Sequence, residues 1–119
     1  MGIHRLHPEG DPATGFVKGD EVQPSEFTTS DHTELIHFAH LNEKTGVSSG
    51  TWKCAPYKAH FESYPCDEMM VVLDGVLKLT DSNGTIETFT KGDTLFISKG
   101  TSLTWEITET MHKYFMISE

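Results

Sequence analysis

The chain has 119 residues, and 9 Lys and Arg against 18 Asp and Glu give it a net charge of -9. This length makes one domain with a modest core. The acidity argues against nucleic acid and anionic membranes as partners, because both attract clustered Lys and Arg. No apolar run reaches the roughly 18 residues of a membrane span, and the first residues hold no apolar stretch of the kind that a secretory signal needs. We therefore expect a cytoplasmic protein in which Cys54 and Cys66 stay reduced.

Residues 1–30 differ in composition from the rest of the chain. They are rich in Gly, Pro, Asp, Glu, Ser and Thr and show neither a helical nor an alternating period. We interpret this segment as an N-terminal arm with short ordered pieces around Phe16-Val17 and Phe27. Two alternatives stay open: a partly mobile tail, or an arm that adds a strand to its own sheet or to a neighbour's. Residues 31–119 then form the main domain.

From Glu34 onward the chain consists of short strand candidates separated by turn residues. Thr, Val, Ile and aromatic residues concentrate in segments that Gly, Pro, Asn or Asp interrupt. Asp74-Gly75 has the chemistry of a tight hairpin. Strands at this spacing indicate an all-β fold, an antiparallel sandwich or closed barrel. The expected strands cover residues 34–41, 50–55, 59–64, 69–73, 76–80, 85–90, 94–98, 102–108 and 112–117.

Two motifs in the second half of the chain resemble those of the cupin superfamily. In DEMMVVLDG, Glu68 precedes an apolar strand that Gly75 follows, and in KGDTLFISKG, Gly92 and Gly100 flank another strand. Ser98 stands where the family usually has Pro. The resemblance implies a single-domain cupin, which is an antiparallel double-stranded β-helix, or jelly-roll barrel.

Further details are similar to one branch of the superfamily, which includes the ethanolamine-utilisation cupin and (S)-ureidoglycine aminohydrolase. The residues that carry this likeness are Gly50-Thr51-Trp52, Cys54-Ala55-Pro56, Tyr64-Pro65 and Trp105-Glu106.

The alternation of side chains along a strand predicts which residues enter the barrel. If Glu68 points inward, Met70 does too, and His60, Glu62 and Tyr64 are expected to share one face because they are spaced by two. The mouth of such a barrel is a common place for a small-molecule site.

Metal-binding cupins present His-x-His, then Glu, then a later His, and only the Glu is kept here. The corresponding positions hold Glu62, Tyr64, Glu68 and Leu103. Loss of the imidazoles lowers the affinity for Fe, Ni, Cu and Zn. We therefore expect no transition metal; if any ion binds, His60, Glu62 and Glu68 would hold it weakly, as a divalent ion such as Mn²⁺.

Three residues are candidate acid–base groups. Glu62 and Glu68 are paired carboxylates that could serve as general acid and base, and His60 supplies an imidazole, the side chain most often used for proton transfer. The candidate ligand-binding residues are Tyr64, Met70, Trp105 and Lys113. Either Lys113 or Tyr114 faces inward on the last strand, and an inward lysine would favour an anionic ligand. Without it, the acids at the barrel mouth favour a cation, an amine or a hard metal ion.

Three functions stay open at this point. The first is a cupin that binds a small polar metabolite in its barrel. The second, raised by the family resemblance, is an enzyme of hydrolase, isomerase or lyase type that acts on a small amine or acid with carboxylate and His groups. The third is a structural or regulatory subunit. We expect a homodimer to which the arm contributes, because the edge strands of a small barrel invite pairing.

Overall fold

Nearly all the regular structure is β-strand in residues 2–119, which are the residues that the computed structural model describes. Within this range there is one short 3-10 helix, η1 (Pro24–Glu26), and no helix with the length and apolar character needed to cross a membrane. The strands are β1 (Val17–Lys18), β2 (Glu34–Asn42), β3 (Val47–Cys54), β4 (Tyr57–Phe61), β5 (Asp67–Asp81), β6 (Ile86–Phe89), β7 (Thr94–Ile97) and β8 (Leu103–Ser118).

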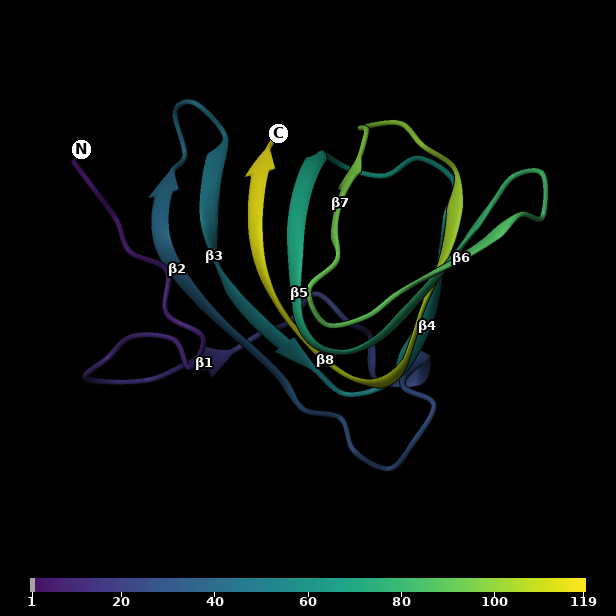
Figure 1. Cartoon of the computed structure of the whole chain (residues 1–119), viewed down its shortest axis with the longest axis horizontal. Coiled ribbons are helices and arrows are strands. Elements are labelled where there is room, and N and C mark those ends of the chain that lie inside the picture. The colour runs from purple at the N-terminus through teal and green to yellow at the C-terminus, as the bar shows by residue number, and fades with distance from the viewer. Residues whose placement is uncertain (1) are drawn as a thin grey trace.

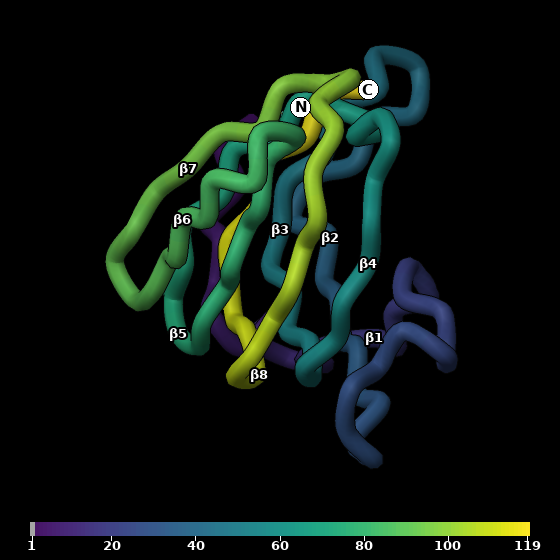
Figure 2. Tube along the Cα trace, turned by 90° about the vertical axis from the view of Figure 1, so that its right-hand side faces the viewer, coloured from purple at the N-terminus to yellow at the C-terminus, as the bar shows by residue number. Residues whose placement is uncertain are grey.

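The strands pair antiparallel in one curled sheet with the order β1-β2-β3-β8-β5-β6, while β4 pairs with β8 and β7 pairs with β5 (Figure 1). The long strands β5 and β8 extend through both layers of the barrel. Their ends near Asp67 and Ser118 pair with β7 and β3, and their other halves pair with β6 and β4. Figure 2 shows β6 and β7 on one side of this central ribbon and β4 on the other. The predicted antiparallel jelly-roll barrel is confirmed.

The prediction of a hairpin at Asp74-Gly75 is wrong, because β5 continues through these two residues as one strand. The register between β5 and β8 shifts at this point, as in a β-bulge. Gly75 has a φ of +88°, and a Cβ there would lie 2.2 Å from the Thr110 carbonyl oxygen. The glycine therefore lets two bent strands approach each other, where a turn was expected. On the facing side of the bend, the two strands expected over residues 102–108 and 112–117 are parts of one continuous strand, β8 (Leu103–Ser118).

The N-terminal arm adds a strand to its own sheet, which is the second of the two alternatives left open. β1 pairs antiparallel with β2. Further upstream, the backbone carbonyls of residues 6–8 accept hydrogen bonds from the side chains of Tyr114, Thr51 and His112. The arm thus lies on the outer face of β3 and β8, and Thr51 is fully buried although it points away from the barrel.

A buried carboxylate attaches the second part of the arm to the barrel. Glu34 Oε1 accepts a hydrogen bond from the Val22 backbone N–H at 3.0 Å, and Glu34 Oε2 accepts one from Trp52 Nε1, also at 3.0 Å. The Glu21 backbone N–H donates to the same Oε2 at 3.3 Å. These bonds hold the arm segment around Glu21 at the mouth of the barrel and fix the orientation of the Trp52 ring.

Candidate functional site

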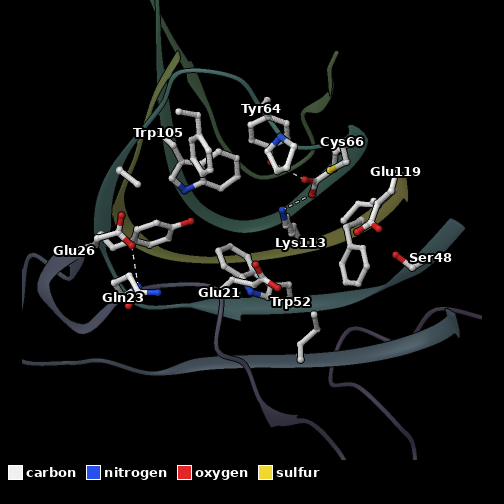
Figure 3. Close-up of a pocket in the computed structure, with 18 of the residues that line it drawn as sticks. Glu21, Gln23, Glu26, Ser48, Trp52, Tyr64, Cys66, Trp105, Lys113 and Glu119 are labelled. Atoms are coloured by element: carbon white, nitrogen blue, oxygen red, sulfur yellow. Dashed lines mark hydrogen bonds and ion pairs between the residues drawn. The ribbon is translucent and has the colours of Figure 1, made fainter. Parts of the chain in front are cut away.

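A pocket of about 520 Å³ opens into the barrel between its two layers. Many of the side chains that line it are aromatic, and these come from β2, β3, β4, β8 and the segment that follows β4. Figure 3 shows Trp52, Tyr64 and Trp105 around a central space into which Lys113 projects. The aromatic lining residues are Trp52, Tyr57, Phe61, Tyr64, Trp105, Phe38 and Phe115.

Three polar side chains form a hydrogen-bonded chain in this pocket. The Lys113 ammonium lies 2.6 Å from Glu68 Oε2, and the Tyr64 hydroxyl donates to Glu68 Oε1 at 2.7 Å. The Lys113 and Glu68 side chains are only 7% and 5% exposed. Both carboxylate oxygens thus have a partner, and the buried ion pair carries no net charge.

Two tryptophan rings flank the Lys113 ammonium. Its nitrogen lies 4.7 Å from the centre of the Trp52 ring and 5.0 Å from that of Trp105, within the range of cation–π attraction. Lys113 reaches this place because it shares the inward face of β8 with Met111 and Phe115. The aromatic walls therefore stabilise a positive charge in the middle of the pocket.

Burial changes the titration of the other pocket groups. It raises the pKa of the Tyr64 hydroxyl, and the neighbouring Glu68 charge adds to this effect. Burial likewise raises the pKa of Tyr57, and it raises the pKa of the Cys66 thiol to about 11, again with a contribution from Glu68. At neutral pH both hydroxyls are therefore hydrogen-bond donors, and the Cys66 thiol is protonated and a poor nucleophile.

Most of the residues that the sequence singles out come together here. Tyr64, Glu68, Trp105 and Lys113 line the pocket, and the Met70 sulfur lies 3.9 Å from the Lys113 nitrogen. Alternation correctly predicts that Glu68, Met70 and Trp105 face inward. Of the two residues left open on the last strand, Lys113 faces in, and its charge is balanced by Glu68.

His60 and Glu62 lie apart from this hydrogen-bonded group: His60 lines the pocket at its edge, and Glu62 is not part of the lining. His60 Nε2 lies 3.1 Å from Glu62 Oε1 and its Nδ1 lies 3.1 Å from Thr104 Oγ1. Their side chains are 52% and 90% exposed, so they meet at the rim and outer surface of the barrel. The expectation that they share a face with Tyr64 is wrong, because β4 ends at Phe61 and the chain bends before Tyr64.

The donor set does not fit the metal centre typical of cupins. Glu68 is the one usual ligand kept, and its oxygens are engaged by a lysine ammonium and a tyrosine hydroxyl. His60 and Glu62, the other members of the set considered from the sequence, lie away from it. Among residues 2–119 no three His, Cys, Asp or Glu side chains are placed to share an ion. A cation at Glu68 would have to displace the ammonium of Lys113.

The rim of the pocket is acidic, but three of its carboxylates are ones that the sequence does not single out. Glu21 and Glu26 of the arm and Glu119 at the last position line it. They are brought there by the tertiary contacts of the arm, which leave no periodic signal. Tyr57 was also missed, although its spacing from Ala59 on β4 could have indicated an inward position.

Glu21 gives this rim a testable pH dependence. Burial, followed by the charges of Glu34, Asp20 and Glu119, raises its pKa above the ordinary 4.5. A carboxylate whose pKa is higher in the folded state lowers stability as the pH rises above its unfolded-state pKa, and the loss is complete above its folded-state pKa. Glu21→Gln should therefore stabilise the protein slightly at neutral pH, by about 0.5 kcal/mol or less because water screens this site.

The advantage of Glu21→Gln should disappear as the pH falls below 4.5 and the wild-type carboxyl takes up its proton. Urea unfolding of both proteins at neutral and acidic pH measures this, with Glu87→Gln on the exposed strand β6 as the control. A stabilisation that grows toward acidic pH would contradict the assignment.

A small antiparallel jelly-roll with a pocket in its mouth is the architecture of a cupin domain. Residues 41–115 match the family model of the EutQ-like cupin domain, and the chain belongs to this family. The resemblance found in the sequence is thereby confirmed. Among curated proteins no sequence matches the chain significantly.

Solved structures share the fold at low sequence identity. A protein of unknown function of the DUF861 family from Pseudomonas syringae pv. tomato superposes with a TM-score of 0.78 at 20% identity, over 92% of this chain and 46% of that one. This chain thus spans less than half the length of the Pseudomonas protein.

Two further structures carry the name EutQ, which the first of them gives in full as ethanolamine utilization protein Q. The Salmonella typhimurium LT2 protein has a TM-score of 0.64 at 19% identity and covers 91% of this chain and 82% of its own. EutQ of Clostridium difficile has a TM-score of 0.58 at 15% identity and covers 83% and 80%. At these identities the comparisons concern the fold.

Proposed function

We propose that this cupin domain binds a small polar metabolite in its barrel pocket. The observation that carries the proposal is the Tyr64–Glu68–Lys113 chain set among aromatic walls. A buried ion pair seldom stabilises a fold more than apolar residues of the same volume would, so its presence in a pocket suggests a functional role. Apolar walls with a few polar groups, in a volume of roughly 300–1,000 Å³, are typical of small-molecule sites.

The charges support a neutral or amino-bearing ligand. Lys113 and Glu68 cancel each other, so the inward lysine does not make the pocket positive. The rim carries the carboxylates of Glu21, Glu26 and Glu119, which repel anions and attract amines. The aromatic rings offer further contacts for a cationic group. Small amino alcohols belong in any ligand panel, and the names of the two EutQ structures point to ethanolamine as one of them.

Intrinsic fluorescence tests the proposal directly, because the chain has two tryptophans and both line the pocket. Titration with ethanolamine, small polyols, hydroxyaldehydes and small carboxylates should give a saturable change for neutral or amino-bearing compounds and a weaker one for the anions. Thermal unfolding should shift upward with the same compounds.

A pocket-filling variant separates pocket binding from surface binding. Ala59 lies beside Trp105 across the β4–β8 pair and lines the pocket. Ala59→Leu should weaken binding by roughly tenfold or more, about 1.4 kcal/mol. Met116→Leu, on the exposed outer face of β8, is the matched control and should bind like the wild type. Equal binding by Ala59→Leu, or no response to any compound class, would contradict the proposal.

A further inference from the structure

We propose that Lys113 forms an imine with the carbonyl group of a small, neutral or amino-bearing aldehyde or ketone bound in the pocket. This inference rests on the proposed function, because the carbonyl compound must first occupy the barrel. It adds a covalent step and a substrate class to that site.

The first argument is the placement of the amine. Lys113 lines an open pocket, yet its side chain is 7% exposed and its nitrogen sits between the faces of Trp52 and Trp105. Lysines that react with carbonyl groups are typically held in such water-poor, apolar surroundings. Figure 3 shows the Lys113 nitrogen directed into the central space, with the dashed contact to the carboxylate on one side of it.

The second argument is the base beside it. An ammonium must lose a proton before its nitrogen can attack, and Glu68 Oε2 lies 2.6 Å away. Transfer of one proton from Lys113 to Glu68 turns an ion pair into two neutral groups, so it creates no net charge in the pocket. Glu68 is thus positioned as the proton carrier of the reaction.

The reaction balances with these two residues alone. Glu68 takes a proton from the ammonium, and the nitrogen lone pair attacks the carbonyl carbon to form the C–N bond. Glu68 returns that proton to the carbonyl oxygen, which becomes a hydroxyl. It then takes a second proton from nitrogen and gives it to the hydroxyl, which leaves as water while the C=N bond forms. The product is an iminium ion, water and the original Glu68 carboxylate, with no oxidant or reductant consumed.

The surroundings suit this product. The iminium carries the same positive charge as the ammonium it replaces, so Glu68 and the faces of Trp52 and Trp105 continue to stabilise it. Tyr64 is a positioning residue, because its hydroxyl holds Glu68 Oε1 at 2.7 Å and leaves Oε2 directed at Lys113. The acidic rim selects carbonyl compounds that carry no negative charge.

Reductive trapping of the wild-type protein tests the proposal without relying on a variant that folds. The protein is incubated with glycolaldehyde or with glyoxylate in the presence of cyanoborohydride, and modified lysines are mapped by peptide mass spectrometry over time. Glycolaldehyde should modify Lys113 first, ahead of the exposed Lys44, Lys91 and Lys99, and glyoxylate should react there more slowly.

Two variants examine the roles of the neighbouring groups. Glu68→Gln should slow the modification of Lys113 by roughly 100-fold, the lower range for loss of a general acid–base group, and leave the exposed lysines unchanged. Tyr64→Phe should shift the pH profile of trapping, whereas a merely structural loss would lower the rate equally at every pH. Glu87→Gln on β6 is the surface control, and circular dichroism verifies that each variant folds.

The outcomes separate this inference from the proposed function. A saturable tryptophan response to glycolaldehyde, with adducts only on exposed lysines, would overturn the imine and leave the pocket as a binding site. No fluorescence response to any compound and no preferred adduct would overturn both. Equal trapping rates in wild type and Glu68→Gln would remove Glu68 from the reaction.

Discussion

Replacing Lys113 by methionine is expected to lower the free energy of unfolding by about 3–5 kcal/mol. The substitution keeps much of the side-chain volume and removes the ammonium 2.6 Å from Glu68 Oε2. The carboxylate would then remain buried with the Tyr64 hydroxyl as its partner and no opposite charge. A single unpaired charge in such a place costs far more than the pair itself contributes, which is why the expected loss is large.

The second ion pair of the β5–β8 ribbon provides a matched control. Lys78 and Glu106 lie 3.4 Å apart with side chains 39% and 23% exposed, so Lys78→Met should cost about 1 kcal/mol or less. Urea unfolding measures both variants. A loss for Lys113→Met no larger than that for Lys78→Met would show that water or a rearranged Glu68 relieves the buried charge.

The double variant Lys113→Met, Glu68→Gln carries the argument from stability to function. With both charges removed, most of the stability should return, since Tyr64 can still donate to the amide oxygen of the glutamine. This variant should fold and yet fail to form the lysine adduct. An ion pair that is dispensable for folding and necessary for the reaction is what we expect of a functional site.

Alternation predicts the site well wherever a residue lies inside a long strand. Glu68 and Met70 on β5 and Trp105 on β8 face the barrel as their spacing requires, because each belongs to a strand that continues on both sides. The same rule fails for His60 and Glu62. A period of two has meaning only while the backbone stays extended, and β4 ends at Phe61.

Other features of the site depend on contacts that no local pattern records. Lys113 and Tyr114 are neighbours on one strand, and the register with β3 and β5 decides which of them faces inward. The acidic rim depends on the position of the arm. The Glu34 carboxylate holds the arm in place by accepting hydrogen bonds from the backbone N–H groups of Glu21 and Val22, which precede it by 13 and 12 positions. The sequence alone does not distinguish a glutamate that is buried by such bonds from a glutamate that stays exposed.

The bend of the β5–β8 ribbon supplies the second large expected effect. Asp74-Gly75 was predicted to form a hairpin because this pair suits a tight turn, and the glycine is indeed in the left-handed region with a φ of +88°. Here the conformation produces a bulge inside a continuous strand. A Cβ at Gly75 would lie 2.2 Å from the Thr110 carbonyl oxygen and 2.8 Å from that of Glu109, which belong to the facing strand.

Gly75→Ala should therefore lower the free energy of unfolding by about 3–5 kcal/mol, as backbone strain and overpacking add together. Gly84 is a well-matched control, because its φ is +82° and a Cβ there would meet nothing within 4 Å. Gly84→Ala should cost only the left-handed strain, about 1–2 kcal/mol. Urea unfolding of both variants isolates the contact with Thr110. Equal losses would mean that β5 can move away from β8 at the bend.

A larger loss at Gly75 would instead indicate that β5 and β8 are held close together at the bend. Glu68 and Lys113 lie on these same two strands, on one side of the bend. A fixed distance between their carboxylate and ammonium groups requires that the two strands stay in place.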